Sequence, residues 1–190
     1  MKRKIIAIVG MCGAGKSEVA DFLIKKGFEY IRLGQITLDE IKRLGLEPTE
    51  KNERPIREAF RKKHGMAAFA ILNMGKIDKA KGDVIIDGLY SWEEYLYFKE
   101  KLQGIKVLAV YSSPKTRYAR LENRAGKHGA DKAMKYRSFS KIEAAARDKA
   151  ELENLHKGGP IAMADFTIIN EGSKKELLEN LGKFWRAINA

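Results

Sequence analysis

The sequence has few of the features that mark a secreted or membrane-embedded protein. It contains one cysteine, Cys12, and can form no internal disulfide, which is typical of a reducing compartment. No apolar run approaches the roughly 20 residues that a membrane helix needs. The basic start at residues 1–4 lacks the apolar stretch of a signal peptide, and the chain shows no internal repeat or low-complexity linker. We therefore expect a cytoplasmic protein that folds as one domain over residues 1–190.

Acidic residues are also scarce relative to basic ones. The chain has 25 Asp and Glu against 37 Lys and Arg, which gives a net charge of +12 and a pI near 9.7. Residues 112–150 alone hold eleven Lys and Arg against four acids. This balance favours an anionic partner, which could be a nucleotide, a coenzyme, a nucleic acid or a membrane headgroup. For most of these side chains the alternative is a solvated helix face.

Strand patterns alternate with helix patterns along the whole chain. We expect strands at 4–9, 28–33, 84–87, 105–111 and 166–169, and helices at 17–26, 37–44, 55–74, 91–102, 114–124, 138–155 and 173–188. The polar stretch 125–137 shows little apolar periodicity, and we expect it to be mobile. The alternation predicts a three-layer α/β/α domain with a five-stranded parallel sheet and ligands at the carboxyl ends of the strands. We assign a helical lid to about 115–157 and an acceptor-binding segment to about 34–75.

The strongest motif is a glycine-rich loop at residues 10–17. It reads Gly-Met-Cys-Gly-Ala-Gly-Lys-Ser, which matches G-x-x-x-x-G-K-[ST], and it lies between an expected strand and an expected helix. Such a P-loop aims backbone N–H groups at phosphate oxygens. We therefore predict ATP with Mg²⁺ as the ligand and P-loop NTPase as the fold, Lys16 reaching the β and γ phosphates and Ser17 binding the metal. The predicted nucleotide contacts are Gly10, Cys12, Gly13, Ala14, Gly15, Lys16 and Ser17; the alternative is a glycine turn with a chance lysine.

An acid ends the third expected strand. The side chain of Asp87 should emerge beside the phosphate loop, where it could hold Mg²⁺ through water or accept the proton of a substrate hydroxyl. We predict both a metal and a catalytic role. The alternative is that Asp87 caps the helix that follows Ser91.

Two groups of arginines recur at helical spacing. Arg117, Arg120 and Arg124 share one helix face just before the basic stretch, and we assign Arg120 and Arg124 to catalysis as lid residues that close over the γ-phosphate. Arg54 and Arg57 are assigned to the phosphate of the acceptor, together with Arg147. Solvated arginines on helices are common, so the alternative is a surface role.

Four segments resemble dephospho-CoA kinase and its nucleoside-monophosphate-kinase relatives. They are the phosphate loop, Val84–Gly88, Arg120 with Arg124 after Ser113-Pro114, and residues 164–173. The similarity extends along nearly the whole chain and is greatest to a mainly archaeal, dephospho-CoA-kinase-like family. This resemblance implies that Asn170 and Gly172 lie beside the adenine and that Arg120 contacts ATP.

The chain departs from this family at two acceptor positions. It has Gln35 where relatives often carry an acid, and Tyr90 where the archaeal type tends to have arginine. Both residues are assigned to the acceptor, and an aromatic Tyr90 suits a base-stacking acceptor. The two changes could equally mean that the ancestral acceptor is no longer used.

Three functions follow as hypotheses. The first is a kinase that transfers a phosphoryl group from ATP to a small nucleotide-like or coenzyme-like acceptor, with no membrane partner. The second, prompted by the +12 charge, is a nucleic-acid-associated P-loop ATPase or polynucleotide kinase. The third is a nucleotide-binding regulator without turnover.

Overall fold

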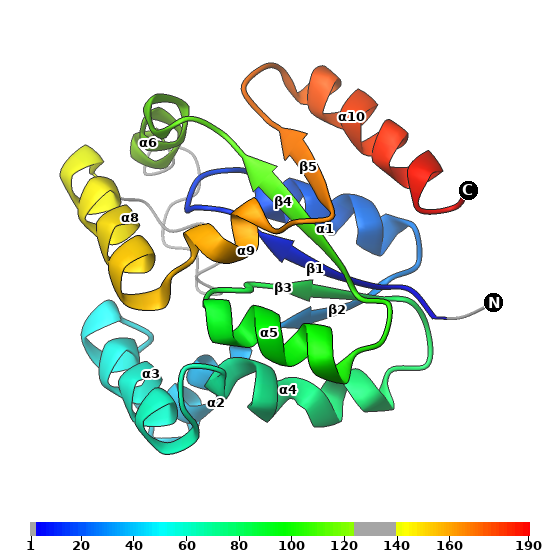
Figure 1. Cartoon of the computed structure of the whole chain (residues 1–190). Helices are drawn as coiled ribbons and strands as arrows, with labels where there is room; N and C mark the ends of the chain where they lie inside the picture. Colours follow the sequence, from blue (N-terminus) through cyan, green and yellow to red (C-terminus); the bar gives the residue numbers. More distant parts are fainter. Residues whose placement is uncertain (1–2, 124–139) are drawn as a thin grey trace.

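A parallel five-stranded sheet forms the centre of the molecule. The computed structural model describes residues 3–123 and 140–190. The strands are β1 (Ile5–Val9), β2 (Glu29–Arg32), β3 (Val84–Asp87), β4 (Lys106–Tyr111) and β5 (Phe166–Ile169). They lie in the order β2-β3-β1-β4-β5, and every neighbouring pair is parallel. The predicted five-stranded parallel sheet is confirmed (Figure 1).

Helices cover both faces of this sheet. They are α1 (Lys16–Lys25), α2 (Gln35–Arg43), α3 (Glu50–His64), α4 (Ala68–Lys79), α5 (Trp92–Lys101), α6 (Pro114–Glu122), α8 (Lys141–Leu155), α9 (Gly158–Ala162) and α10 (Lys174–Ala187). One core packs β1, β3 and β4 against α4 and α5, and includes Phe69 and Phe98. The other packs the opposite face against α1 and α10, and includes Leu23 and Phe184. Because strand residues alternate between faces, two cores on one sheet give the predicted three layers.

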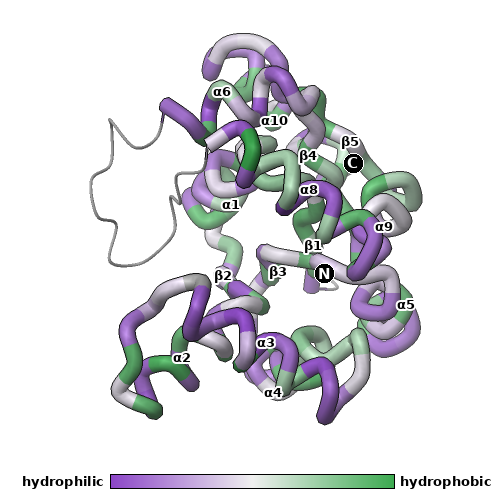
Figure 2. Tube along the Cα trace, turned by 90° about the vertical axis from the view of Figure 1, so that its left-hand side faces the viewer, coloured by the Kyte–Doolittle hydropathy of each residue, from purple (hydrophilic) through white to green (hydrophobic). Residues whose placement is uncertain are grey.

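The carboxyl ends of the strands are where the remaining helices gather. Helix α8 lies on one side of the ends of β1 and β3, and α3 lies on the other (Figures 1 and 2). The hydropathy colouring shows that α3 is mostly hydrophilic, and Phe60 of this helix packs against the first core (Figure 2). Among the described residues, no helix has the length and apolar character to cross a bilayer.

The prediction of one helix over residues 55–74 is wrong. The chain forms two helices there, because Gly65 adopts φ 76° and ψ −176° and ends α3 at His64. Helix α3 also begins earlier than expected, at Glu50, where the Thr49 hydroxyl accepts a hydrogen bond from the Asn52 backbone N–H. Pro55 lies inside this helix rather than at its start.

Two further outcomes concern the lid and the short helix that follows it. The five-residue helix α9 was not predicted, because it is short and contains two glycines and a proline. Arg124 and the stretch 125–137 lie outside the described residues. Of the segment assigned to the lid, the structure describes α6 and α8, and α9 begins directly after it, at Gly158.

Candidate functional site

The phosphate loop connects β1 to α1 and is packed on both sides. Gly13 and Gly15 have φ values of 82° and 100°, which side chains rarely adopt. A Cβ on Gly15 would lie 2.3 Å from Nδ2 of Asn170, and one on Gly13 would lie 2.9 Å from the carbonyl oxygen of Arg117. The loop is therefore seated against α6 and the end of β5, and only glycine fits at these two positions.

Lys16 lies across this loop at the start of α1. Its Nζ donates to the carbonyl oxygens of Gly10 at 2.9 Å and Met11 at 3.1 Å. Burial, followed by the positive charge of Lys157, lowers the pKa of Lys16 from 10.5 to about 8. A bound phosphate would oppose both causes and favour the charged lysine.

Asp87 is the last residue of β3. In the register of the sheet it pairs with Ile8, two residues before the phosphate loop begins. Oδ2 of Asp87 accepts a hydrogen bond from the Tyr30 hydroxyl at 2.7 Å. Burial and the Asp87 charge raise the pKa of Tyr30, so the phenol stays a donor. Tyr30 thus fixes one oxygen of the carboxylate beside the loop.

Asp87 does not cap α5, which was its alternative role. The cap of α5 is a reciprocal box in which Ser91 accepts from the Glu94 backbone N–H and the Glu94 carboxylate accepts from the Ser91 backbone N–H. Asp87 lies before this box and points its carboxylate to Tyr30 instead.

The oxygen ligands near the loop fit Mg²⁺ delivered with a nucleotide. Ser17, in the first turn of α1, offers a hydroxyl, and Asp87 offers a carboxylate. Mg²⁺ prefers oxygen ligands and commonly takes only one or two from the protein, with phosphates and water supplying the rest. Across residues 3–123 and 140–190, no group of three or more His, Cys, Asp or Glu forms a metal site of its own.

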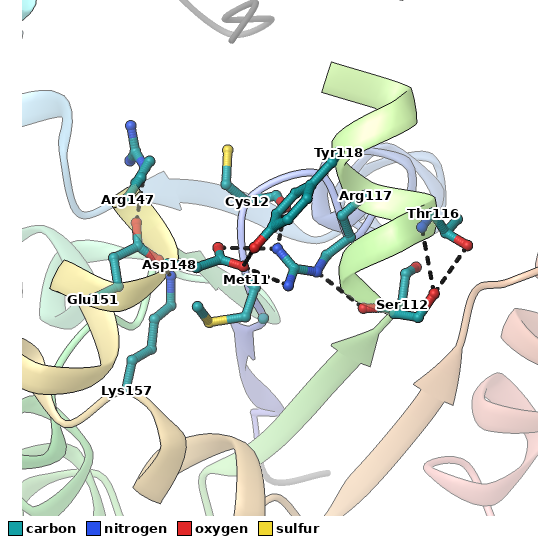
Figure 3. A network of polar contacts seen from close by, with 12 residues as sticks. Met11, Cys12, Ser112, Thr116, Arg117, Tyr118, Arg147, Asp148, Glu151 and Lys157 are labelled. Carbon is teal, nitrogen blue, oxygen red and sulfur yellow. Dashed lines mark hydrogen bonds and ion pairs between the residues drawn. The ribbon is translucent and has the colours of Figure 1, made fainter. Parts of the chain in front are cut away.

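Arg117 holds the lid helix to the phosphate loop. Its guanidinium pairs in bidentate fashion with Asp148 of α8, at 3.0 and 2.6 Å, and both side chains are buried. The same guanidinium donates to the carbonyl oxygens of Cys12 and Ser112. The Tyr118 hydroxyl donates to Asp148 as well, so one carboxylate ties α8 to α6 (Figure 3). Arg117 was expected on the lid face, and in the structure it connects α6, α8 and the phosphate loop.

Arg120 and Asn170 meet at the ends of β4 and β5. Nη1 of Arg120 donates to the Asn170 carbonyl oxygen at 2.9 Å and to the Ser112 hydroxyl at 3.0 Å. The Asn170 side chain donates from Nδ2 to the Ala14 carbonyl oxygen at 2.8 Å. The structure thus brings Arg120 and Asn170 to the phosphate loop, although they lie 50 residues apart.

A hollow of about 280 Å³ lies next to this contact, between the end of β5 and α10. It is lined by Ile169, Asn170, Glu171, Gly172, Glu176, Leu177, Glu179 and Asn180. Both residues predicted to lie beside the adenine are among these. Their role in base binding stays a prediction.

The residues assigned to the acceptor are spread over two sides of the site. Gln35 begins α2 and donates to Asp39, and Arg57 of α3 pairs with Glu53 at 3.0 Å. Arg54 is the outermost, with a side chain that is 72% exposed and paired with Glu58. Across from α3, Arg147 of α8 pairs with Glu151 at 3.0 Å. Tyr90 lies between these groups in sequence, in the loop between β3 and α5.

The sequence did not predict a buried ion cluster that lies between α8, the start of α9 and the loop after β3. Nζ of Lys157 donates to Oε2 of Glu151 at 2.6 Å, and it lies 4.6 Å from the centroid of the Tyr90 ring. Burial alone would raise the pKa of Glu151, but the charges of Lys157 and Arg147 lower it to about 2. The one available signal was the four-residue spacing of Arg147 and Glu151, which predicts an ion pair but not its burial.

Together, the fold and the loop define a class. A parallel sheet whose first strand runs through Gly10–Ser17 into a helix is a P-loop nucleotide-binding fold of the kinase-like type. The chain belongs to the AAA domain family, whose model matches residues 6–164, and to the family of UPF0200 proteins.

The relatives show the family, and the solved structures show the fold. The UPF0200 protein of Thermococcus gammatolerans is 35% identical over 177 residues, which cover 90% of this chain and 88% of that protein. A shikimate kinase from Bacteroides thetaiotaomicron superposes with a TM-score of 0.60 at 15% identity, over 98% of this chain and 99% of that one. A gluconokinase from Sinorhizobium meliloti gives 0.57 at 14%, over 99% and 98%. At these identities the two kinases show a shared fold, and the resemblance to dephospho-CoA kinase stays a prediction.

Proposed function

We propose that this protein transfers a phosphoryl group from ATP, with Mg²⁺, to a hydroxyl or phosphate of a small acceptor. The observation that carries the proposal is the position of Asp87, whose carboxylate is held by Tyr30 at the end of the strand next to the phosphate loop. A phosphate loop alone supports nucleotide binding. A fixed carboxylate beside it adds a group that can take the proton of an attacking hydroxyl.

The division of roles follows from the donors at each position. The loop N–H groups and Lys16 bind the β and γ phosphates, and Ser17 directly and Asp87 through water would hold Mg²⁺, which neutralises phosphate charge when bound. The acceptor oxygen forms a bond to the γ phosphorus while the bond to the bridging oxygen of ADP breaks. The proton of the acceptor hydroxyl passes to Oδ1 of Asp87, because Oδ2 accepts from Tyr30.

The acceptor is proposed to lie between the helices α2 and α3 and the lid. Gln35, Arg57, Tyr90 and Arg147 are its candidate contacts, and a nucleotide or a dephospho-CoA-type molecule would match their mixture of amide, cationic and aromatic groups. The kinases with a similar fold are named for shikimate and gluconate, so these two hydroxyl acceptors belong in the same screen.

A phosphoryl-transfer screen tests the proposal. Purified protein with Mg-ATP is offered nucleosides, nucleoside monophosphates, dephospho-CoA, shikimate, gluconate and short RNA ends, and labelled products are resolved. We expect transfer to a small acceptor that disappears in Lys16→Ala and persists in Lys25→Ala, an exposed lysine of the same helix. Asp87→Asn should keep ATP binding and lower the rate by about 10²- to 10⁴-fold. Tight ATP binding without transfer to any acceptor would contradict the proposal and favour a regulator.

A further inference from the structure

Glu171 lies in the turn between β5 and α10 (residues 170–172) and binds the first turn of α6. Its carboxylate accepts hydrogen bonds from the Ser113 backbone N–H, from the Ser113 hydroxyl at 3.3 Å and from the Thr116 hydroxyl at 2.5 Å. These hydrogen bonds, that from Thr116 first, lower the pKa of Glu171 below its usual 4.5. Glu171 is therefore an ionised acceptor at the start of a helix, where a negative charge is favoured.

The start of α6 differs from that of three other helices in the origin of its capping carboxylate. Each of α5, α8 and α10 begins after a serine and has a glutamate three residues later, which accepts from the serine backbone N–H. Helix α6 also begins after a serine, Ser113, but has Thr116 at the equivalent position. Glu171 supplies the carboxylate instead, from 58 residues away. The first turn of α6 thus depends on a contact with the β5–α10 turn.

Asn170, the neighbour of Glu171, connects the same turn to the phosphate loop. Its Nδ2 donates to the Ala14 carbonyl oxygen at 2.8 Å. Its own carbonyl oxygen accepts from Nη1 of Arg120 at 2.9 Å and from the Ser112 hydroxyl at 2.5 Å. Through these two adjacent residues, the β5–α10 turn contacts both the phosphate loop and the first half of α6.

A nucleotide whose phosphates occupy the loop would meet this turn with its nucleoside part. The loop is seated against α6 and the end of β5, and the β5–α10 turn bonds to both the loop and α6. The hollow of about 280 Å³ opens beside the turn, and Asn170, Glu171 and Gly172 all line it. The loop N–H groups account for the phosphates, and the turn and its hollow provide a place for the rest of the nucleotide.

We infer that Glu171 is a positioning residue for the nucleotide, which holds the β5–α10 turn on the start of α6 and so keeps Asn170 in place for the nucleoside part. This inference rests on the proposed function in one respect, namely that the phosphate loop binds ATP, and it requires neither an acceptor nor turnover. Without the Glu171 contact, the turn and α6 would also adopt other relative positions. The apparent affinity for the nucleotide then falls with the fraction of molecules that keep the competent arrangement.

Calorimetry on matched variants tests this role. We measure the affinities of Mg-ATP and inorganic tripolyphosphate for the wild type, Glu171→Ala and Glu143→Ala. Glu143 is the control because its carboxylate accepts from the Ser140 backbone N–H and hydroxyl, both at 2.8 Å, at the start of α8. We expect Glu171→Ala to weaken Mg-ATP about tenfold, as for the loss of one hydrogen bond to a charged group. Tripolyphosphate has no nucleoside, so its affinity should change by less than about twofold, and Glu143→Ala should change neither ligand by more than this.

A compensating substitution separates this positioning role from simple capping of α6. Thr116→Glu places a carboxylate where α5, α8 and α10 have theirs, three residues after the capping serine. Combined with Glu171→Ala, it should restore the protection of the α6 amides from hydrogen exchange. Binding of Mg-ATP should stay weak in this double variant, because the contact between α6 and the β5–α10 turn is still absent.

The outcomes distinguish this inference from the proposed function. Wild-type affinity for Mg-ATP in Glu171→Ala, or recovery of that affinity in the double variant, would overturn the positioning role of Glu171. Equal losses for Mg-ATP and tripolyphosphate would overturn it too, because the effect would then lie in the phosphate loop. A loss confined to Mg-ATP, with no phosphoryl transfer by the wild type, would support the role of Glu171 and contradict the kinase. A wild type that binds neither ligand would overturn both.

Discussion

Gly15 shows how backbone conformation and crowding act on one residue. An alanine there would adopt a left-handed conformation, at a cost of about 1–2 kcal/mol, and its Cβ would lie 2.3 Å from the Asn170 amide that bonds to Ala14. We expect Gly15→Ala to lower the free energy of unfolding by at least this amount and to weaken ATP binding at least tenfold. Denaturant unfolding and calorimetry measure the two effects.

Gly34 supplies the matched control for this substitution. It has φ −69° and ψ −7°, and a Cβ there would meet nothing within 4 Å. Gly34→Ala should therefore be neutral or stabilising by about 0.4–1 kcal/mol, because it restricts the unfolded chain. Equal effects of Gly15→Ala and Gly34→Ala would show that neither the left-handed backbone nor the Asn170 contact requires glycine at position 15.

Glu94 makes the stability of the fold depend on pH. Burial raises the pKa of this carboxyl from 4.5 to about 7, although the backbone N–H groups of Tyr90 and Ser91 and the charge of Arg61 oppose the shift. Because the folded state holds the proton more tightly than the unfolded chain, this contribution is present below pH 4.5 and is lost as pH rises to 7. At 1.36 kcal/mol per pKa unit, the loss amounts to about 3 kcal/mol.

The comparison with Glu94→Gln isolates this contribution. Glutamine keeps an acceptor oxygen and does not titrate, so the wild type should lose about 3 kcal/mol relative to the variant between pH 4.5 and 7. Urea unfolding at several pH values measures the difference, and Glu100→Gln, an exposed position of the same helix, is the control. A difference that is constant with pH would contradict the raised pKa.

Only some of the residues in the site could be predicted from the sequence. Lys16 and Ser17 follow from a contiguous motif, and Asp87 follows from its place at the end of a strand. Tyr30 could not be found this way, because its partner Asp87 lies 57 residues away, and the contact of Lys157 with the Tyr90 ring likewise spans 67 residues. Local motifs thus predict phosphate chemistry better than the cluster that surrounds it.

At the scale of elements, the lid helix is attached through one buried ion pair. Asp148 of α8 accepts two hydrogen bonds from Arg117 and one from Tyr118. Removing one member of a buried pair leaves an unpaired charge, at a cost of about 3–5 kcal/mol. We expect Asp148→Ala to destabilise the protein by this amount and to speed amide hydrogen exchange in α8 more than in β1.

Glu153→Ala is the control for the lid helix. Its carboxylate lies on the exposed side of α8 and contacts Lys149 at 3.9 Å, so its loss should cost less than about 1 kcal/mol. If Asp148→Ala were as mild as this control, the lid would be held by the rest of the α6 and α8 contact and not by the ion pair.

Element boundaries were predictable where capping residues or apolar runs marked them. Strands β3 and β5 match the expected ranges, since each is a short apolar run with clear flanking residues. The missed break at Gly65 has a different cause. Apolar residues continue on both sides of it, so the pattern alone does not mark the break. In the structure, Phe60 of α3 packs edge to face on Phe69 of α4, and this contact joins the two helices.

For the whole molecule, the net charge of +12 leads to a prediction about nucleic acid. Several of the basic side chains nearest the phosphate loop are already paired inside the fold, among them Arg117, Arg147 and Lys157. Others on the surface pair with neighbouring acids, as Arg43 does with Glu40. Each such pair removes one positive and one negative charge, so the excess of twelve positive charges remains, and an excess of this kind supplies sequence-independent attraction to phosphates.

We therefore expect only non-specific binding of RNA or DNA. Such binding typically has dissociation constants of about 10⁻⁴ to 10⁻⁶ M at physiological salt and weakens steeply between 50 and 200 mM, because each phosphate contact releases counterions. Titration of a fluorescent oligonucleotide over this salt range measures it, and Lys16→Ala should bind as the wild type does, since the phosphate loop is not involved. A dissociation constant well below 10⁻⁶ M at 200 mM salt, sensitive to Lys16, would make a polynucleotide the substrate of the phosphate site and move the acceptor from a small molecule to a nucleic-acid end.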